Sequence, residues 1–311
     1  MNLLHKQFKL RNKLVLFYLP VFIIPITVLG VYLSIALNRN SIDQSLQIYH
    51  QSTNLLQQSI MSELSDYYSI GIDIAQDSNV VEYLGIEGSS DIELYNFYVQ
   101  RIGELIDKAK YQQDNIQLRI YTSNTNLKFS GIFVRDAAQF EEKKKQAAAY
   151  TSSACWQGIS EQKVWIKNQL LSRKYLTFLM PIMNYQRSLE PIGVLELKMD
   201  ISRLQELIDT QNISDNIVLL TDSSGRFILS NITADDTLLE IAKTEKQNDE
   251  SEHYVTYLEE RYLATISNVT NAQIGVGGWT LCNLIPLDYV NRNRNSIVGA
   301  CITVCAGCLL G

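Results

Sequence analysis

The sequence has few of the residues from which catalytic and metal sites are built. Its only histidines are His5, His50 and His253, and neither His-Glu-x-x-His nor Gly-x-Ser-x-Gly occurs. Those patterns place metal ligands or a nucleophile where the chemistry needs them. The glycine-rich residues 275–278 lack the later glycine and the helix of a phosphate-binding loop. We therefore expect no catalytic residues, no metal site and no cofactor.

Cysteine is also scarce, with five residues in 311, which excludes a disulfide scaffold. Cys301, Cys305 and Cys308 fall in a closing apolar run, where a thiol is usually a small hydrophobic group. Cys155 and Cys282 are the two that could pair, and the sequence leaves that question open.

Acidic residues are absent from both ends of the chain. All 33 lie within residues 38–295, together with 23 of the 27 basic residues, so that segment has a formal charge of 23 − 33 = −10. A nucleic-acid partner needs a basic face, so we expect none. The segment is long enough for one or two domains with cores.

Residues 14–37 contain no charge at all. As a helix they would reach about 36 Å, enough for a hydrocarbon core of about 30 Å. Pro20 and Pro25 are tolerable in lipid. A buried core helix or a cleaved signal peptide fits less well, because the run is too long and no small-x-small site follows it. We predict an uncleaved transmembrane helix.

The charges on either side of this helix predict its orientation. Residues 1–13 carry four Lys or Arg and no acid, which keeps them in the cytoplasm and sends residues 38–295 outside. Residues 296–311 form a second uncharged run, shorter than the roughly 20 residues needed to cross. We read it as an incomplete second transmembrane helix, and the protein as a multi-pass protein of the cell membrane.

Residues 41–76 have the apolar spacing of a helix face. The stripe contains Ile42, Leu46, Tyr49, Thr53, Leu56, Ile60, Leu64 and Tyr67, with gaps of mostly three and four. We predict a stalk helix of roughly 50 Å. Its stripe could cover its own domain, a partner copy, or both.

Beyond the stalk, a second helix is expected over residues 91–111, with Ile92, Tyr95, Val99, Ile102, Ile106 and Ala109 on one side. The period then changes to two, which predicts strands. These are expected over residues 116–121, 127–134, 163–166, 173–180, 191–200, 216–222, 227–230, 253–258, 261–266 and 279–285. Residues 137–150 read as a solvated surface helix whose charge run, residues 141–145, has no functional meaning. The pattern is α+β with antiparallel sheets.

Three stretches resemble the double Cache sensor domains of bacterial transmembrane receptors. Residues 217–230 (IVLLTDSSGRFILS) resemble the hairpin of the membrane-proximal unit. Residues 175–182 (YLTFLMPI) with 192–200 (IGVLELKMD) resemble the strand pair closing the distal unit. Residues 278–286 (GWTLCNLIP) resemble the strand before the second membrane helix. The start, LRNKLVLF from Leu10, resembles the YesM-type sensor histidine kinases.

The resemblance implies two tandem PAS-like units, a distal one over about residues 80–200 and a membrane-proximal one over about 201–290. Such kinases continue into a HAMP linker, a phosphoacceptor-histidine helix and an ATP-binding domain, and no such sequence occurs in these 311 residues. The chain is thus expected to be the sensing part of a two-component system. It is expected to lack catalysis itself, although a full-length relative would be a kinase.

The resemblance also implies that a ligand sits against the distal sheet. The polar and aromatic strand residues expected to bind it are Arg119, Tyr121, Arg135, Trp165, Tyr175 and Glu196. Expected partners are a small extracellular ligand or a solute-binding protein, a second copy in a homodimer, and the lipid bilayer. A Cache sensor of a chemotaxis receptor or of a cyclic-dinucleotide enzyme is the alternative, as is a free-standing membrane-anchored binding protein.

Overall fold

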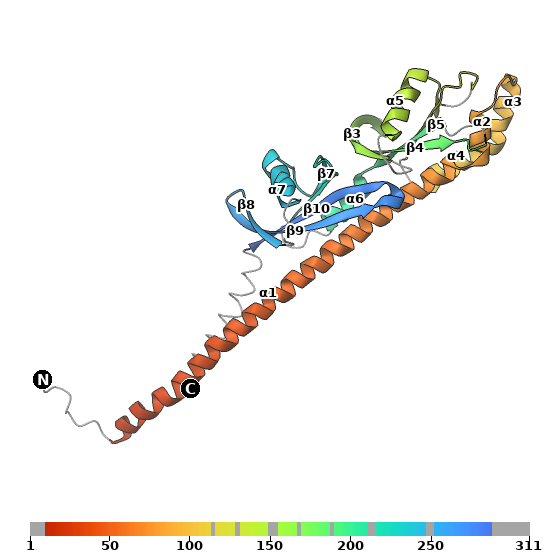
Figure 1. Ribbon diagram of the computed structural model, residues 1–311. Coiled ribbons are helices and arrows are strands. Elements are labelled where there is room, and N and C mark those ends of the chain that lie inside the picture. The colour runs from red at the N-terminus through yellow and green to blue at the C-terminus, as the bar shows by residue number, and fades with distance from the viewer. Residues whose placement is uncertain are drawn as a thin grey trace.

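A computed structural model describes residues 10–112, 116–127, 131–148, 155–166, 169–186, 190–210, 216–246 and 252–287. One long helix, α1 (Leu10–Ala75), opens the chain and extends along both of the units that follow it (Figure 1). Two sheet-containing units lie one after the other along its C-terminal half (Figure 1). We call the unit farther from the start of α1 the distal unit and the other the proximal unit.

The distal unit begins with short helices at the end of α1. They are α2 (Ser78–Leu84), α3 (Asp91–Phe97), the π-helical turn η1 (Tyr98–Ile102) and α4 (Gly103–Gln112). Its sheet, in the order β2-β1-β5-β4-β3, contains β1 (Gln117–Tyr121), β2 (Phe133–Val134), β3 (Cys155–Ile166), β4 (Gln169–Met183) and β5 (Pro191–Asp200). Helix α5 (Ala137–Ala148) covers the sheet face opposite α1 (Figure 1).

The proximal unit repeats this arrangement with the sheet order β7-β6-β10-β9-β8. Its elements are α6 (Ser202–Thr210), β6 (Ile217–Thr221), β7 (Phe227–Ser230), α7 (Asp236–Lys246), β8 (Glu252–Tyr257), β9 (Glu260–Asn271), the 3-10 turn η2 (Ala272–Ile274) and β10 (Val276–Pro286). All its strand pairs are antiparallel. The predicted α+β class with two units of mainly antiparallel sheet is confirmed, the parallel pair β1–β2 of the distal unit being the exception.

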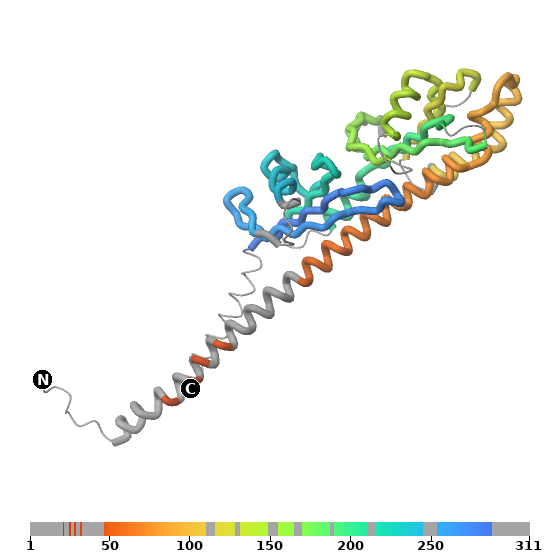
Figure 2. Tube along the Cα trace, viewed as in Figure 1, coloured from red at the N-terminus to blue at the C-terminus, as the bar shows by residue number. Residues whose placement is uncertain are grey.

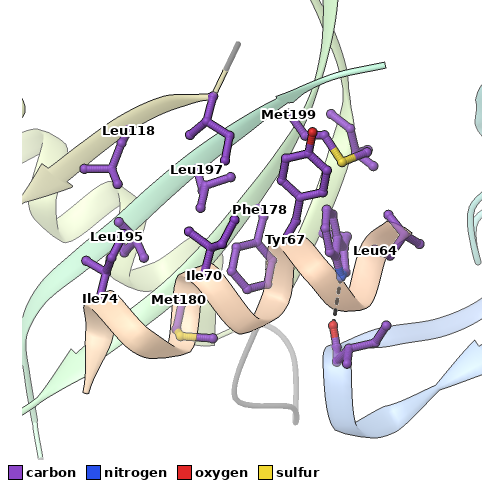
Figure 3. Close-up of a cluster of buried hydrophobic side chains, with 14 of the residues drawn as sticks. Leu64, Tyr67, Ile70, Ile74, Leu118, Phe178, Met180, Leu195, Leu197 and Met199 are labelled. Carbon is purple, nitrogen blue, oxygen red and sulfur yellow. Dashed lines mark hydrogen bonds between the residues drawn. The ribbon is translucent and has the colours of Figure 1, made fainter. Parts of the chain in front are cut away.

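The stripe on α1 packs against its own two units. Tyr49, Thr53, Leu56, Ile60, Leu64 and Tyr67 are all buried. Figure 3 shows Leu64, Tyr67, Ile70 and Ile74 of α1 against Leu118, Phe178, Met180, Leu195, Leu197 and Met199 of the distal sheet. Because apolar positions recur every three or four residues, one face of the helix can serve both units. From Tyr49 to Tyr67 the stripe therefore covers its own domain, one of the expected readings, while the side chains of Ile42 and Leu46 lie outside the described part.

One position on α1 makes an unusually close approach to the sheet. A Cβ added to Gly71 would lie 2.6 Å from Cε1 of Phe178, closer than two carbons can pack. Only a glycine lets the helix backbone come this near the ring.

Replacing Gly71 with alanine should therefore destabilise the protein by about 1–3 kcal/mol through overpacking. The matched control is Gly103→Ala, since Gly103 also has helical backbone angles and an added Cβ there would meet only ordinary contacts. That variant should gain roughly 0.5–1 kcal/mol. Urea titrations of both variants measure the difference, and equal effects would contradict the packing described.

The two units also touch each other. The β9–β10 hairpin runs beside α1 toward the distal unit (Figure 2), and at its tip the Ile274 carbonyl accepts a 2.8 Å hydrogen bond from Nε1 of Trp156 in β3. The rings of Trp156 and Trp279 meet edge to face at 6.3 Å. Glu63 of α1 pairs with Arg203 of α6 at 3.2 Å. Helix and units thus share one apolar cluster.

The buried face expected over residues 91–111 is confirmed at Ile102, Ile106 and Ala109 and wrong at Ile92, Tyr95 and Val99. Ile92, Tyr95 and Val99 are 74%, 50% and 50% exposed, while Leu94, Ile102 and Ile106 are buried. The cause is the π-helical turn at Tyr98–Ile102. A π turn takes one more residue than an α turn, so it shifts the apolar face between α3 and α4.

The strand expected over residues 127–134 is wrong in length and direction. Only Phe133–Val134 forms a strand, it runs parallel to β1, and residues 128–130 lie outside the described part. Strands β3, β4 and β9 are longer than expected, and β5 and β7 match. Cys155 and Cys282 are buried on different sheets and are not joined to each other by a disulfide.

The membrane segments stay predictions. Residues 14–37 fall within α1, but most side chains before Gln47 lie outside the described part, as do residues 1–9 and 288–311. Within the part of the chain that is described, no helix has the length and apolar character needed to span a bilayer.

Candidate functional site

The face of the distal sheet beneath α5 gathers polar side chains. Arg119 stands opposite Glu196, and Lys198 stands opposite Thr177. Because side chains alternate along a strand and paired residues share a face, these four and Tyr121 belong to one face. The other face, with Leu118, Leu195 and Leu197, packs on α1 (Figure 3).

Between this face and α5 lies a cavity of about 540 Å³, which we call the distal pocket. It is lined by Lys143, Gln146, Gln157, Gly158, Ile159, Ser160, Thr177, Glu196, Lys198 and Arg226. Its volume falls in the range of about 300–1,000 Å³ typical of small-molecule sites. Most small-molecule sites are lined mainly by apolar side chains, whereas this lining includes the charged residues Lys143, Glu196, Lys198 and Arg226.

Glu196 is the centre of the charged network. Its carboxylate accepts a hydrogen bond from the Tyr121 hydroxyl at 3.0 Å and one from Nζ of Lys143 at 2.7 Å. Nζ of Lys198 lies 3.9 Å from the same carboxylate. Burial raises the pKa of Tyr121, and the charge of Glu196 raises it further. Tyr121 is therefore a neutral donor at neutral pH.

Lys143 reaches this network from α5. Phe140 and Ala147 of the same helix are buried against Tyr121 and Leu179 of the sheet. Residues three or four apart share a helix face, so Lys143, between them, also faces the sheet. Its side chain is only 19% exposed. The expectation that the charge run over residues 141–145 is merely solvated is thus wrong for Lys143, whose ammonium sits beside a buried carboxylate.

Lys198 is the most buried cation of the site. Its side chain is 13% exposed, and among the described residues its ammonium makes one ion pair, with Glu196 at 3.9 Å. An ammonium has three hydrogen-bond donors and is rarely buried without close partners. The Lys198 ammonium can therefore make further bonds inside the pocket.

Arg226 comes from the proximal unit. It follows the β6–β7 turn predicted from Asp222 to Gly225, where Gly225 takes a left-handed φ of 77°. The Asp222 carboxylate accepts bonds from Ser224 and from the backbone and Nε of Arg226 at 2.7–2.9 Å. Burial opposes ionisation of Asp222, but these bonds outweigh it and lower its pKa. An ionised Asp222 holds Arg226 at the distal pocket.

The six residues expected to bind a ligand occupy different places. Glu196 lines the distal pocket and Tyr121 donates to it. Arg119 is exposed on the same sheet face, and Tyr175 is buried there beyond Thr177. Arg135 lies elsewhere, donating to the Leu127 carbonyl. Trp165 pairs with Leu170 near the outer end of the β3–β4 hairpin, and its side chain lies outside the described part.

Sequence reasoning missed Lys143, Lys198 and Arg226 as lining residues. A signal existed for Lys198, which stands two positions after Glu196 on one strand and so shares its face. No such signal existed for Lys143 or Arg226, because only tertiary packing brings them to the distal pocket.

A second cavity of about 500 Å³ lies between α1 and β4. Its lining is mostly apolar and includes Tyr68, Ile72, Val81, Met180 and Met183. Small-molecule sites combine an apolar wall with a few convergent polar groups, and in this region of the structure the polar groups converge on the distal pocket instead. We therefore take the distal pocket as the candidate site.

Comparison with known proteins relates the chain to solved structures. No protein-family model matches the sequence. No curated protein matches it either. The ligand-binding domain of the Campylobacter jejuni chemoreceptor Tlp3, in complex with 4-methylisoleucine, matches with a TM-score of 0.55 at 13% identity, over 81% of this chain and 94% of that one.

Two further structures match at similar levels. The extracellular domain of the putative histidine kinase vpHK1S-Z8 has a TM-score of 0.52 at 15% identity, covering 81% of this chain and 99% of that one. A domain of a putative sensory box/GGDEF family protein from Vibrio parahaemolyticus has 0.52 at 16%, covering 80% and 96%. The chain thus has the two-unit fold of bacterial ligand-binding sensor domains, as the Cache resemblance implied.

Proposed function

We propose that residues 38–295 form the extracellular ligand-sensing domain of a membrane receptor and that the distal pocket is its binding site. The observation that carries this proposal is the distal pocket itself. A charged, partly enclosed cavity of about 540 Å³ lies between α5 and the distal sheet. The buried carboxylate of Glu196 lines this cavity and has Tyr121, Lys143 and Lys198 as polar neighbours.

The ligand class follows first from size, since the cavity suits a small molecule. The similar domain of Tlp3 holds 4-methylisoleucine, which supports a small solute here too. A solute-binding protein docking on the distal unit is the alternative partner carried over from the resemblance. The acidic charge of the outer segment continues to argue against nucleic acid.

Signal transfer would use the elements that contact both units. Helix α1 packs on the distal sheet and on the proximal unit, and its first part contains the predicted membrane segment, residues 14–37. A ligand changes the receptor only if it binds two arrangements unequally. We propose that a homodimer supplies those arrangements, with α1 and β10 passing the change to the membrane helices at residues 14–37 and 296–311.

The output is proposed to be a histidine kinase of the YesM type, because the start of the chain resembles that group. A chemotaxis receptor is an equally supported output, since domains of the same fold belong to a chemoreceptor and to a putative histidine kinase. The coding sequence beyond the codon for Gly311 discriminates between them. A histidine-box helix there would support the kinase, and a chemoreceptor signalling domain would contradict it.

Filling the distal pocket should weaken ligand binding. Gly158 lines the distal pocket, and a Cβ added there meets no heavy atom within 4 Å, so Gly158→Phe introduces a ring at the pocket without a clash at Cβ. Gly277→Phe, in the proximal unit, is the matched control because its Cβ is equally unobstructed. The purified 311-residue chain in detergent would be screened by thermal shift with L-amino acids, small carboxylic acids, sugars and inorganic phosphate.

The compound that raises the melting temperature most would then be titrated calorimetrically into both variants. We expect Gly158→Phe to lose at least about tenfold in affinity, which is 1.4 kcal/mol, and Gly277→Phe to bind normally. Equal binding by the two variants would contradict the assignment of the pocket.

A further inference from the structure

The lining of the distal pocket is positive in an otherwise acidic segment. Lys143, Lys198 and Arg226 stand against one carboxylate, Glu196, so the lining has a formal charge of 3 − 1 = +2. Asp222 behind Arg226 reduces this to +1. Residues 38–295 as a whole carry −10. Positive charge is thus concentrated where a ligand would sit.

The carboxylate of the pocket, Glu196, already has hydrogen-bond donors from the protein. Glu196 accepts from Tyr121 and Lys143 at 3.0 and 2.7 Å. A cationic ligand would have to displace Lys143 from this carboxylate and leave a lysine without its counterion, which is costly in a partly buried site.

Two hydrogen-bond donors in the pocket, on Lys198 and Ser160, can still bind a ligand. Lys198 has its nearest carboxylate at 3.9 Å, and the buried hydroxyl of Ser160 has no hydrogen-bond partner among the described residues. Hydrogen bonds from cations to an oxyanion are short and about twice as strong as neutral ones. The pocket therefore favours a ligand that supplies acceptor oxygens.

Arg226 adds a further cation to the lining of the distal pocket, from the other unit. Its Nε binds Asp222 at 2.7 Å, while its side chain remains 63% exposed and lines the distal pocket. The β6–β7 turn that carries it is fastened by the Asp222 bonds. A ligand that contacts Arg226 would connect the distal sheet directly to the proximal unit.

We propose that the distal pocket binds a small molecule bearing a carboxylate or phosphate group, held by Lys198 of the distal unit and Arg226 of the proximal unit. This inference builds on the proposed function and adds the ligand class and the second unit's contribution. Binding then bridges the two units, because both must keep their relative position for the oxyanion to reach both cations.

The test compares acids with their neutral amides on the 311-residue chain in detergent. The probes are succinate and succinamide, N-acetyl-L-isoleucine and N-acetyl-L-isoleucinamide, and inorganic phosphate, each titrated by calorimetry at low salt. We expect at least one of the oxyanions to bind and its neutral counterpart, where there is one, to bind at least about tenfold more weakly. A response to phosphate alone would identify the phosphate class, and a response to an acid the carboxylate class.

Charge-removing variants then locate the contact. Lys198→Gln and Arg226→Gln should each weaken binding about tenfold or more. The controls are Lys163→Gln and Arg261→Gln, two exposed cations on β3 and β9 outside the pocket lining, and these should leave affinity unchanged. Circular dichroism melts confirm that each variant is folded.

Three outcomes would overturn the inference. They are amides that bind as tightly as acids, no binding by any oxyanion at millimolar concentration, and affinity unchanged in Lys198→Gln and Arg226→Gln. The first and third are compatible with the distal pocket as a sensing site if Gly158→Phe still lowers the affinity at least about tenfold. Binding that survives Gly158→Phe would instead remove the proposed function itself.

Discussion

Replacing Trp156 with alanine should lower the free energy of unfolding by about 3–5 kcal/mol, the range for deleting a buried tryptophan. The indole is buried, packs on Phe178 at 4.8 Å and on Trp279 at 6.3 Å, and donates to the Ile274 carbonyl. Truncation removes this packing and the direct bond between the two units. Urea unfolding followed by circular dichroism measures the loss.

Two companion variants separate packing from hydrogen bonding. Trp156→Phe retains most of the apolar contact and loses the donor to Ile274, so it should cost less, with about 1 kcal/mol due to the bond. Tyr185→Ala removes an aromatic ring that is mostly exposed and should stay within about 0.5 kcal/mol of the parent. A Trp156→Ala loss as small as that of Tyr185→Ala would contradict the packing of the two units.

The second large effect is expected at Glu196. Glu196→Leu leaves Lys143 and Lys198 beside each other with no anion between them, and breaking a buried pair in this way costs about 3–5 kcal/mol. We expect the lower end of that range, because Lys143 retains 19% of its exposure. Urea titration at low and high salt measures the loss, which should shrink as salt screens the two ammonium groups.

The control for this effect is a carboxylate of the same type at the surface. Glu190 pairs with Lys144 at 3.0 Å, but its side chain is largely exposed, so Glu190→Leu should change stability by no more than about 1 kcal/mol. Adding Lys143→Met to Glu196→Leu should recover part of the loss, since it removes one of the unbalanced charges. A Glu196→Leu cost equal to that of Glu190→Leu would show that the network contributes nothing.

Several helices, strands and turns could be predicted because their signals are local in the sequence. The stripe from Tyr49 to Tyr67 follows the helical period and is buried, and β5 and β7 have the limits predicted from their apolar runs and the turn residues beside them. The β6–β7 turn followed from Asp222 and Gly225, whose side-chain and backbone preferences are local. These elements needed no knowledge of their partners.

What could not be predicted depends on packing between distant residues. The π-helical turn at Tyr98 shifts an apolar face, yet nothing in the local spacing announces it. Strand β2 is shortened because its pairing with β1 holds at only two positions. In both cases tertiary contacts overrode the local pattern.

The candidate site divides in the same way. Tyr121 and Glu196 were chosen as polar and aromatic strand residues, and the register between β1 and β5 brings them together. Lys143 looked like one charge in a solvated run, and only the burial of Phe140 and Ala147 turns it inward. Arg226 enters the distal pocket from another unit, a contact that no local pattern encodes.

The most direct test of this account is the ratio of ligand dissociation constants for Gly158→Phe and Gly277→Phe, measured calorimetrically on the same preparation with the same compound. Ligand binding between α5 and the distal sheet predicts a ratio of at least about ten, with the control equal to the parent chain. A ratio near one would show that the ligand binds elsewhere and that the distal pocket is not the sensing site.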